Sequence, residues 1–224
     1  MKDDPPDLWS GAYAGQYEDA NYGSGLAGYV MRRSHELVEK PFDSNVTFER
    51  VIEVGAGSGF HLHSVRHRFN EYVLTDFSAD MLQNVGSASR QGNVTVLAQD
   101  ATALSFADAS FDRLIAAHVL EHLYRPQEVL REWVRVLRPG ATLSLVLPCD
   151  PGMMWRLGRN FGPRQKARQN GLAYDYVMAR EHVNAISNLV AFIRYYFDRR
   201  EEYWWPARVP SIDLNLIYAV NIKV

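Results

Sequence analysis

Residues 50–59 read Arg-Val-Ile-Glu-Val-Gly-Ala-Gly-Ser-Gly, a short apolar run that ends in three closely spaced glycines. The apolar run predicts a buried strand, and the glycines allow the backbone to turn tightly and a ligand to approach it closely. The dinucleotide pattern Gly-x-Gly-x-x-Gly requires glycine at its sixth position, where this chain has Phe60. The P-loop pattern also fails, because no Gly-Lys-Ser/Thr follows. The stretch therefore predicts a strand and a ligand-binding turn that match neither pattern.

Strand-like runs alternate with helix-like segments around this stretch. We expect strands at 50–54, 72–75, 93–98, 111–116 and 141–147, and helices at 24–40, 61–69, 78–88 and 126–137. Such alternation predicts an α/β fold with a doubly wound, mostly parallel sheet, whose ligands bind beyond the carboxyl ends of the strands. The candidate loops are therefore 55–60, 76–78, 99–102 and 117–122.

The alternation ends after Pro148. Residues 150–180 form an insert, and a helix is expected over 180–197. Two β-rich runs follow at 202–205 and 214–224, with no room for a crossover helix between them, so an antiparallel hairpin is predicted.

The composition indicates in which cellular compartment the protein is expected. The chain has 24 lysines and arginines and 26 acidic residues, so its net charge is near zero. No overall positive electrostatic field therefore favours the binding of nucleic acid. A single cysteine, Cys149, excludes an internal disulfide framework. The first residues lack the basic and apolar regions of a signal peptide, and no apolar stretch approaches ~20 residues. We expect a cytoplasmic protein.

Two carboxylates follow the second and third expected strands. Asp76 stands where a carboxylate can bind both hydroxyls of a ribose, although it can also serve as a helix cap near Ser78. Asp100, followed by Ala101, can accept a hydrogen bond from an adenine amino group while a backbone amide serves a ring nitrogen. Both lie on the edge of the sheet where the glycine turn is expected.

The ordered set of 51–60, Asp76, Asp100-Ala101, 111–123 and 135–140 resembles class I S-adenosylmethionine (SAM)-dependent methyltransferases of the ubiquinone–menaquinone methylase-like group, methyltransferase type 11. The resemblance implies a seven-stranded sheet with an antiparallel last strand, and SAM as cofactor with S-adenosylhomocysteine as product. It places Glu53, Gly55 and Gly57 around the methionine part, Asp76 on the ribose, Asp100 and Ala101 on the adenine, and His118 beside the sulfonium. The full expected cofactor set is Glu53, Gly55, Ala56, Gly57, Gly59, Asp76, Phe77, Met81, Asp100, Ala101 and His118.

We expect one domain over residues 1–224. It consists of an N-terminal helical cap (1–45), a SAM-binding core (46–148), a substrate-side insert after the fifth strand with its helix (149–197) and a terminal β-hairpin (198–224).

Methyl transfer from SAM is a direct in-line displacement, and a hydroxyl acceptor usually requires a positioned general base, most often histidine. We prefer His182 as that base, with His118 and Tyr17 as further candidates; the alternative for His182 is a capping or core histidine. His61, His63 and His67 are expected to be surface residues of the first core helix, with His61 near enough to its start to approach SAM.

A bound metal ion that activates the acceptor is a more specific alternative to a general base. His118-x-x-Glu121-His122 with the distant His182 is similar to the Glu-x-x-Glu-His set with a distal histidine of small-RNA 2′-O-methyltransferases. The first position here is His rather than Glu, and Leu-Glu-His-Leu is common in metal-free methyltransferases, where Glu121 and His122 are structural. We therefore expect no metal; any metal bound here should prefer nitrogen-rich ligation.

The acceptor is expected to be a small molecule. The N-terminal aromatic residues and the basic insert should cover the site, and the candidate substrate contacts are Tyr13, Tyr22, Arg156, Arg159 and Asn184. Arginine suits phosphate or carboxylate, so we expect a polar or anionic acceptor such as a sugar nucleotide or lipid head group. A contact of the basic insert with a membrane surface, or a solvated basic face, stays open as an alternative.

Two other functions compete. An RNA methyltransferase is disfavoured by the balanced charge and by the lack of a separate RNA-binding module, and we expect no DNA partner. A SAM-binding protein that transfers no methyl group, either a scaffold or a pericyclase-like enzyme, is the other alternative, because a fold does not fix the chemistry.

Overall fold

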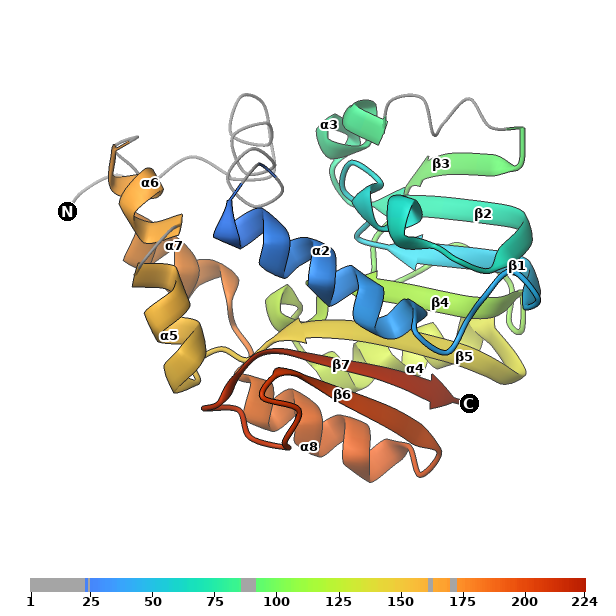
Figure 1. Cartoon of the computed structure of the whole chain (residues 1–224). Helices are drawn as coiled ribbons and strands as arrows, with labels where there is room; N and C mark the ends of the chain where they lie inside the picture. Colours follow the sequence, from blue (N-terminus) through green and yellow to red (C-terminus); the bar gives the residue numbers. More distant parts are fainter. Residues whose placement is uncertain (1–22, 24, 86–91, 161–162, 170–172) are drawn as a thin grey trace.

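The computed structural model describes residues 23, 25–85, 92–160, 163–169 and 173–224. Seven strands form one sheet in the order β3-β2-β1-β4-β5-β7-β6 (Figure 1). Their bounds are β1 Thr47–Val54, β2 Arg68–Asp76, β3 Val94–Ala98, β4 Phe111–Ala117, β5 Leu137–Pro148, β6 Arg200–Pro206 and β7 Asn215–Lys223.

Strand directions confirm the predicted fold class. The pairs β1–β2, β2–β3, β1–β4 and β4–β5 are parallel, whereas β7 runs antiparallel to both β5 and β6. The strand order reverses between β1 and β4, which are neighbours in the sheet. In such sheets the ligand binds at the carboxyl ends of the strands on either side of this reversal.

Helices cover both faces of the sheet. They are α2 Leu26–Glu39, α3 Ala79–Leu82, α4 Pro126–Val136, α5 Met153–Asn160, α6 Pro163–Gln169, α7 Tyr174–Glu181 and α8 Ile186–Tyr196, with short 3-10 turns η1 Phe60–Ser64 and η3 Leu120–His122. Because side chains alternate along a strand, Ile52 of β1 packs in the core that α4 and α8 complete, whereas Val51 packs in a second core with Leu62 of η1. On that second face α2 buries Leu37 and Val38 against β5 and β7.

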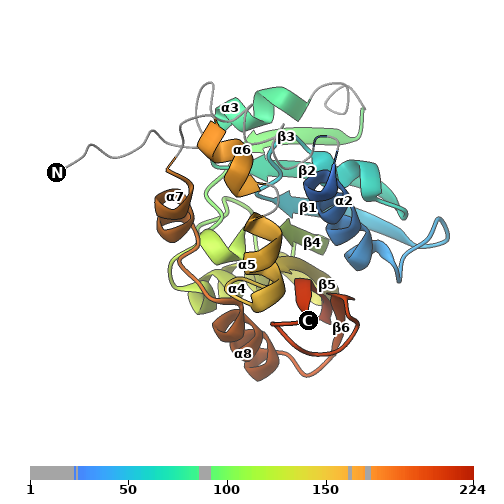
Figure 2. The same ribbon diagram turned by 60° about the vertical axis from the view of Figure 1, so that its left-hand side comes forward.

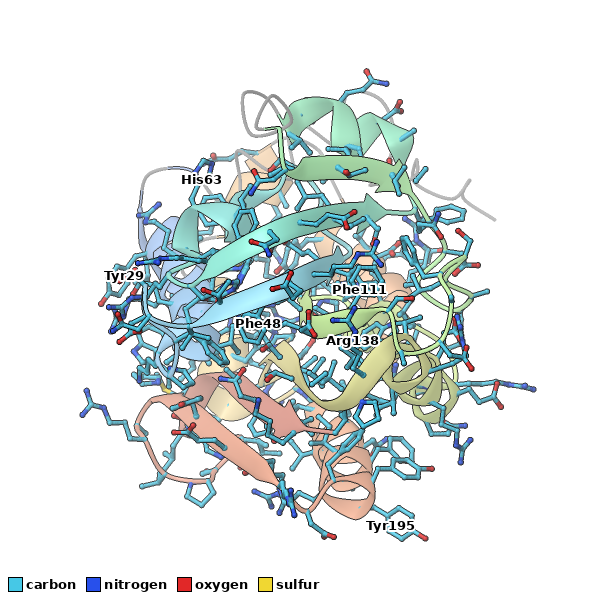
Figure 3. All side chains as sticks on the ribbon, turned by 90° about the vertical axis from the view of Figure 1, so that its right-hand side faces the viewer. Tyr29, Phe48, His63, Phe111, Arg138 and Tyr195 are labelled. Carbon is cyan, nitrogen blue, oxygen red and sulfur yellow. The ribbon has the colours of Figure 1, made fainter. Side chains whose placement is uncertain are left out.

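The helices of the insert stand at one end of the sheet. In Figure 1, α5, α6 and α7 lie to the left, and Figure 2 brings this end forward. Since β7 points to the right in Figure 1 and runs antiparallel to β5, the carboxyl ends of the parallel strands point toward the insert. Figure 3 shows the opposite end, where Phe48 and Phe111 lie near the starts of β1 and β4.

The helix predicted over 61–69 is wrong. Only the short turn η1 forms, and β2 already begins at Arg68, where it pairs in parallel with Thr47 of β1. Ladder hydrogen bonds to β1 therefore outweigh the local helical pattern.

The expectation that His61 and His67 lie at the surface is also wrong. The His61 side chain is buried against His35 and Glu39 of α2. The His67 side chain is buried against the rings of Phe42 and Phe48, whereas His63 is exposed.

The helix predicted over 180–197 is divided. Helix α7 ends at Glu181 and α8 begins at Ile186, so His182 follows one helix instead of starting the other. The intervening residues are held by contacts that compete with helix formation: the His182 side chain bonds Asp150, and the Asn184 amide donates to two backbone carbonyls of another loop. Of the helix predicted over 78–88, α3 forms at Ala79–Leu82 and a 3-10 turn continues to residue 85, whereas residues 86–88 lie outside the described residues. Ser78 caps α3 by accepting from the Met81 amide at 3.3 Å.

A buried ion pair fastens α2 to the sheet. Glu39, at the end of α2, lies 2.7 Å from the Arg113 guanidinium of β4 and 3.0 Å from His61 Nε2. The guanidinium also stacks over the Phe42 ring at 4.2 Å. Burial acts to raise the pKa of Glu39, but Arg113 and His61 outweigh burial and hold that pKa at about 2. Within the described residues, no helix is long and apolar enough to cross a membrane.

Candidate active site

The glycine turn is built from left-handed backbone. Gly55, Gly57 and Gly59 have φ of 67°, 53° and 76°, a region that side-chain-bearing residues rarely adopt. A Cβ at Gly55 would lie 2.3 Å from Val119 Cγ2 in the loop after β4. Glycine is therefore required here for two reasons, and the close approach brings the loops after β1 and β4 into contact at the reversal point.

Asp76 joins the glycine turn to the end of β2. Its Oδ2 accepts from the Gly57 amide at 2.9 Å and its Oδ1 from the Ser78 amide at 2.8 Å. Burial raises the pKa of this carboxyl, and the amide hydrogen bonds only partly oppose the rise. Each carboxylate oxygen keeps a further lone pair, so the side chain can hold the loops together and still accept from ribose hydroxyls.

The loop after β3 provides the second carboxylate. Asp100 Oδ1 accepts from the Thr102 amide and hydroxyl at 2.8 and 2.7 Å, which leaves its Oδ2 outside this turn. The carbonyl of Ala101 accepts from Trp133 Nε1 at 2.9 Å, so helix α4 fixes the position of the loop. These contacts present a carboxylate and a backbone edge at the carboxyl end of β3, as adenine recognition requires.

Phe77 and Met81 flank Asp76 in different ways. The Phe77 side chain is 81% exposed, so its ring is available as an apolar surface beside the carboxylate. Met81 is buried, and its Cε lies 3.3 Å from where a Cβ on Gly57 would stand. Ala56 donates its amide to the Thr75 carbonyl at 2.8 Å, which ties the glycine turn to β2.

Glu53 lies below the glycine turn within the protein. Its Oε2 accepts from the Tyr72 hydroxyl at 2.8 Å, and burial raises the pKa of this carboxyl. The side chain is thus oriented by β2. Its predicted contact with the methionine part of SAM remains a prediction.

His118 is held in a strained conformation. Its φ is 59°, although it is not glycine, and its amide donates to the Val146 carbonyl at 2.9 Å. Ser34 of α2 donates its hydroxyl to the Met31 carbonyl at 2.7 Å, so at 3.0 Å this hydroxyl accepts from His118 Nε2. Nδ1 lies 3.7 Å from Glu121 Oε1. Helix α2 therefore sets the orientation of the imidazole at the end of β4.

Three side chains from two distant segments gather beside His118. The rings of His122 and His182 meet edge to face with centroids 4.9 Å apart, and His122 Nε2 lies 3.9 Å from Glu121 Oε1. One potential ligand atom from each of Glu121, His122 and His182 lies within 4.8 Å of the others. All three residues stand out in the sequence, but only the fold brings them together.

Asp150 is a member of the site that the sequence analysis did not single out. Its Oδ2 lies 2.8 Å from His182 Nδ1 and 3.7 Å from the Arg159 guanidinium. Burial acts to raise the pKa of Asp150, but His182 and Arg159 outweigh burial and lower it. Its position directly after β5, at the edge where ligands bind, is the signal that could have identified it.

The expected substrate contacts are placed unevenly. Arg159 is partly buried at Asp150, and Arg156 is exposed on α5. Asn184 donates its amide hydrogens to the carbonyls of Leu120 and Leu123 at 3.1 and 2.7 Å, so only its Oδ1 is left for a substrate. Tyr13, Tyr17 and Tyr22 lie outside the described residues.

Comparison with known proteins agrees with this geometry. Residues 52–145 match the family model of the methyltransferase domain. The chain is 34% identical to the demethylmenaquinone methyltransferase of Thermobifida fusca, in an alignment that covers 58% of this chain and 59% of that protein. It spans 39% to 59% of the length of the demethylmenaquinone methyltransferases that it matches.

Two solved structures share the fold over most of their length. A SAM-dependent methyltransferase from Aquifex aeolicus superposes with a TM-score of 0.61 at 16% identity, covering 94% of this chain and 98% of that one. The (4+2)-cyclase SpnF superposes with a TM-score of 0.60 at 16% identity, covering 86% of this chain and 80% of that one.

The strand order, the glycine turn with its two carboxylates and the family match all point in the same direction. Residues 52–145 are thus similar to the methyltransferase domain family, and the fold is the one found in SAM-dependent methyltransferases.

Proposed function

We propose that this protein transfers the methyl group of SAM to an oxygen or nitrogen atom of a small, polar or anionic molecule, such as a sugar, a lipid head group or a secondary metabolite. The observation that carries the proposal is the position of the loop after β4. Val119 of this loop contacts the glycine turn, and His122 of the same loop contacts His182 of the insert. The loop therefore links the expected methyl donor to the expected acceptor.

The cofactor side follows from the carboxyl edge of the sheet. SAM supplies a sulfonium whose methyl group is already electrophilic. Asp76 would hold the ribose, Asp100 and Ala101 the adenine, and the turn from Gly55 to Gly59 the methionine part. Phe77 and Met81 would border the nucleoside, and His118 would stand nearest to the sulfonium. The tight loop contacts support this assignment because they hold these groups before the cofactor binds.

The acceptor side is assigned to the insert and the N-terminal cap. We assign His182 to activation of the acceptor, because Asp150 fixes its Nδ1 and directs its Nε2 elsewhere. His118 and Tyr17 are the supporting candidates. Arg156 and Arg159, with Tyr13 and Tyr22, would bind an anionic group, and the partly buried Arg159 is the best placed of the described residues.

A quinone-type small molecule is the second candidate acceptor, since the relatives compared above are named for demethylmenaquinone. The cyclase that shares the fold favours one further outcome, in which SAM is bound and no methyl group is transferred. An RNA acceptor has no supporting contact among the described residues.

Product formation tests the proposal. The protein is incubated with SAM and, in separate reactions, with a sugar nucleotide, phosphoethanolamine, a demethylmenaquinone-like quinol and a structured RNA, and release of S-adenosylhomocysteine is measured. We expect turnover with a small molecule, and a 10²- to 10⁴-fold lower rate for His182→Ala with S-adenosylhomocysteine affinity retained. Equal turnover in that variant would remove His182 from the reaction, and turnover with RNA alone would contradict the proposal.

A further inference from the structure

We infer that Glu121, His122 and His182 form a binding site for a divalent transition-metal ion of the zinc type. Binding of the metal follows from the geometry of these residues alone. Its role, activation of the acceptor hydroxyl, rests on the proposed function.

The ligand set is compact and comes from two segments. Glu121 and His122 are neighbours in η3, and His182 arrives from the end of α7, sixty residues after His122. One ligand atom of each lies within 4.8 Å of the others, and Glu121 is buried while both histidines are partly buried. Small movements of the side chains would bring all three atoms to about 2.0–2.2 Å from one ion.

Both imidazoles are oriented as metal-binding imidazoles are. His122 Nδ1 lies 2.9 Å from the Glu181 carbonyl, so it must donate to that oxygen. His182 Nδ1 lies 2.8 Å from Asp150 Oδ2. Histidines that bind metals almost always donate their second N–H to a carbonyl or a carboxylate, which fixes the tautomer and leaves the other nitrogen to the metal. Here Nε2 is that other nitrogen in both residues.

The Glu121 carboxylate gives a second observation in favour of a cation, independent of the spacing of the ligand atoms. Glu121 is almost fully buried, and among the described residues its Oε2 has no hydrogen-bond partner. A buried carboxylate oxygen without a partner is costly, so this atom requires a cation or a donor. Its Oε1 already lies 3.7 Å from His118 Nδ1 and 3.9 Å from His122 Nε2. An ion between the three side chains would be held first by Oε1, the oxygen nearer to the imidazoles, and Oε2 would gain a cation as the second oxygen of the same carboxylate.

Two imidazoles and one carboxylate favour zinc or a similar borderline ion over magnesium or calcium, which prefer oxygen ligands. Three protein ligands leave at least one coordination position open. A hydroxyl bound there would lose its proton to solvent more readily and become an alkoxide or phenolate. That oxygen would attack the methyl carbon of SAM, so a C–O bond forms, the C–S bond breaks, and S-adenosylhomocysteine leaves with the electron pair.

A metal-free base explains less of the structure. It accounts for the contact between His182 and Asp150. It supplies no cation to Glu121 Oε2, which has no hydrogen-bond partner among the residues that the structure describes, and it gives His122 no role in the reaction. The metal explains all four residues. The sequence alone favoured no metal, because position 118 is His rather than Glu and because Leu-Glu-His-Leu is common in metal-free methyltransferases.

Metal binding and cofactor binding are measured separately to test the inference. Zinc is titrated calorimetrically into the chelator-treated wild-type protein, His122→Ala, His182→Ala and Asp150→Ala, with the exposed His63→Ala as the matched control. Cobalt is used as a spectroscopic probe of the same site. We expect one ion per chain, binding at least 100-fold weaker in His122→Ala and His182→Ala, 10- to 100-fold weaker in Asp150→Ala and unchanged in His63→Ala.

Each variant is also titrated with S-adenosylhomocysteine and checked by thermal unfolding, so that a folding defect is recognised. Zinc affinity equal in the wild type, His122→Ala and His63→Ala would overturn the inference, as would the absence of zinc binding in a wild-type protein that binds S-adenosylhomocysteine. In both cases the proposed methyl transfer would stand with His182 as a metal-free base. Zinc binding without S-adenosylhomocysteine binding would instead refute the proposed function and leave the metal site.

Discussion

Gly55 shows how one residue couples the glycine turn after β1 to the loop after β4. Its φ of 67° excludes most side chains, and an added Cβ would overlap Val119 of the loop after β4. Gly140 offers a matched comparison, because its φ is 82° but nothing lies within 4 Å of an added Cβ. The pair separates backbone strain from contact between the loops.

We predict that Gly140→Ala destabilises the fold by ~1–2 kcal/mol through backbone strain alone. Gly55→Ala should cost ~1–3 kcal/mol more, because Val119 must move, and should also weaken S-adenosylhomocysteine binding. Urea unfolding and calorimetric titration of both variants measure these effects. Equal destabilisation of the two variants, with equal cofactor affinity, would show that the loops do not constrain each other.

At the scale of elements, helix α4 positions the loop expected to bind adenine. Trp133 is fully buried in α4, and its indole N–H donates to the Ala101 carbonyl. Trp204 of β6 is also buried, but its indole N–H donates to Glu202 of the same strand. Strand β6 is at the opposite end of the strand order from β3, far from the loop that holds Ala101. The helix thus supports the core and the loop after β3 at once.

We predict that Trp133→Phe lowers stability by ~1–3 kcal/mol, since the Ala101 carbonyl loses its donor, and weakens S-adenosylhomocysteine binding several-fold. Trp204→Phe, as control, should lower stability without changing that affinity. Denaturant unfolding and titration of both variants provide the comparison. Unchanged affinity in Trp133→Phe would show that the indole serves only the core.

Elements with a clear periodic pattern were predictable from the sequence, and those fixed by distant contacts were not. The expected strands at 50–54 and 111–116 and the helix at 126–137 correspond to β1, β4 and α4, because their apolar patterns agree with their burial. Residues 61–69 were mistaken for a helix because the pairing of β2 with β1 is not visible locally.

The same distinction applies to the site. The glycine turn and Asp76 could be identified because they follow strands directly, and their roles remain predictions. The position of Asp150 shortly after β5 could have marked it as a site residue, but its role could not be assigned, because that role depends on His182, which reaches it from the far end of the insert. Likewise, the orientation of His118 depends on Ser34 of α2, whose register against β4 no short motif encodes.

Across the whole molecule, buried charge makes stability depend on pH. Glu39 has a pKa of about 2 in the folded state, below its ordinary value near 4.5. Its contribution is therefore present above pH 4.5 and is lost as pH falls toward 2. His67 has a pKa of about 4, lowered by burial and by Arg113 from near 6.5. Its neutral form favours folding above pH 6.5, and this advantage is lost as pH falls toward 4.

We predict that the free energy of unfolding declines steadily from pH 6.5 to pH 2. Glu39→Gln should be less stable by on the order of 3 kcal/mol at pH 7, because Arg113 loses its buried partner. This variant should also lose less stability than the wild type between pH 4.5 and pH 2. Urea unfolding at several pH values gives both curves, and parallel curves for the two proteins would exclude Glu39 as a source of the acid sensitivity.

The account depends most on the claim that the carboxyl edge of the sheet binds SAM through Asp76. Calorimetric titration with S-adenosylhomocysteine and, separately, with NADH tests it directly in the wild type, Asp76→Ala and the exposed Asp198→Ala control. We predict micromolar binding of S-adenosylhomocysteine only, a 10- to 100-fold loss in Asp76→Ala and no change in Asp198→Ala. Absence of binding in the wild type, or equal affinity in Asp76→Ala, would contradict the assignment.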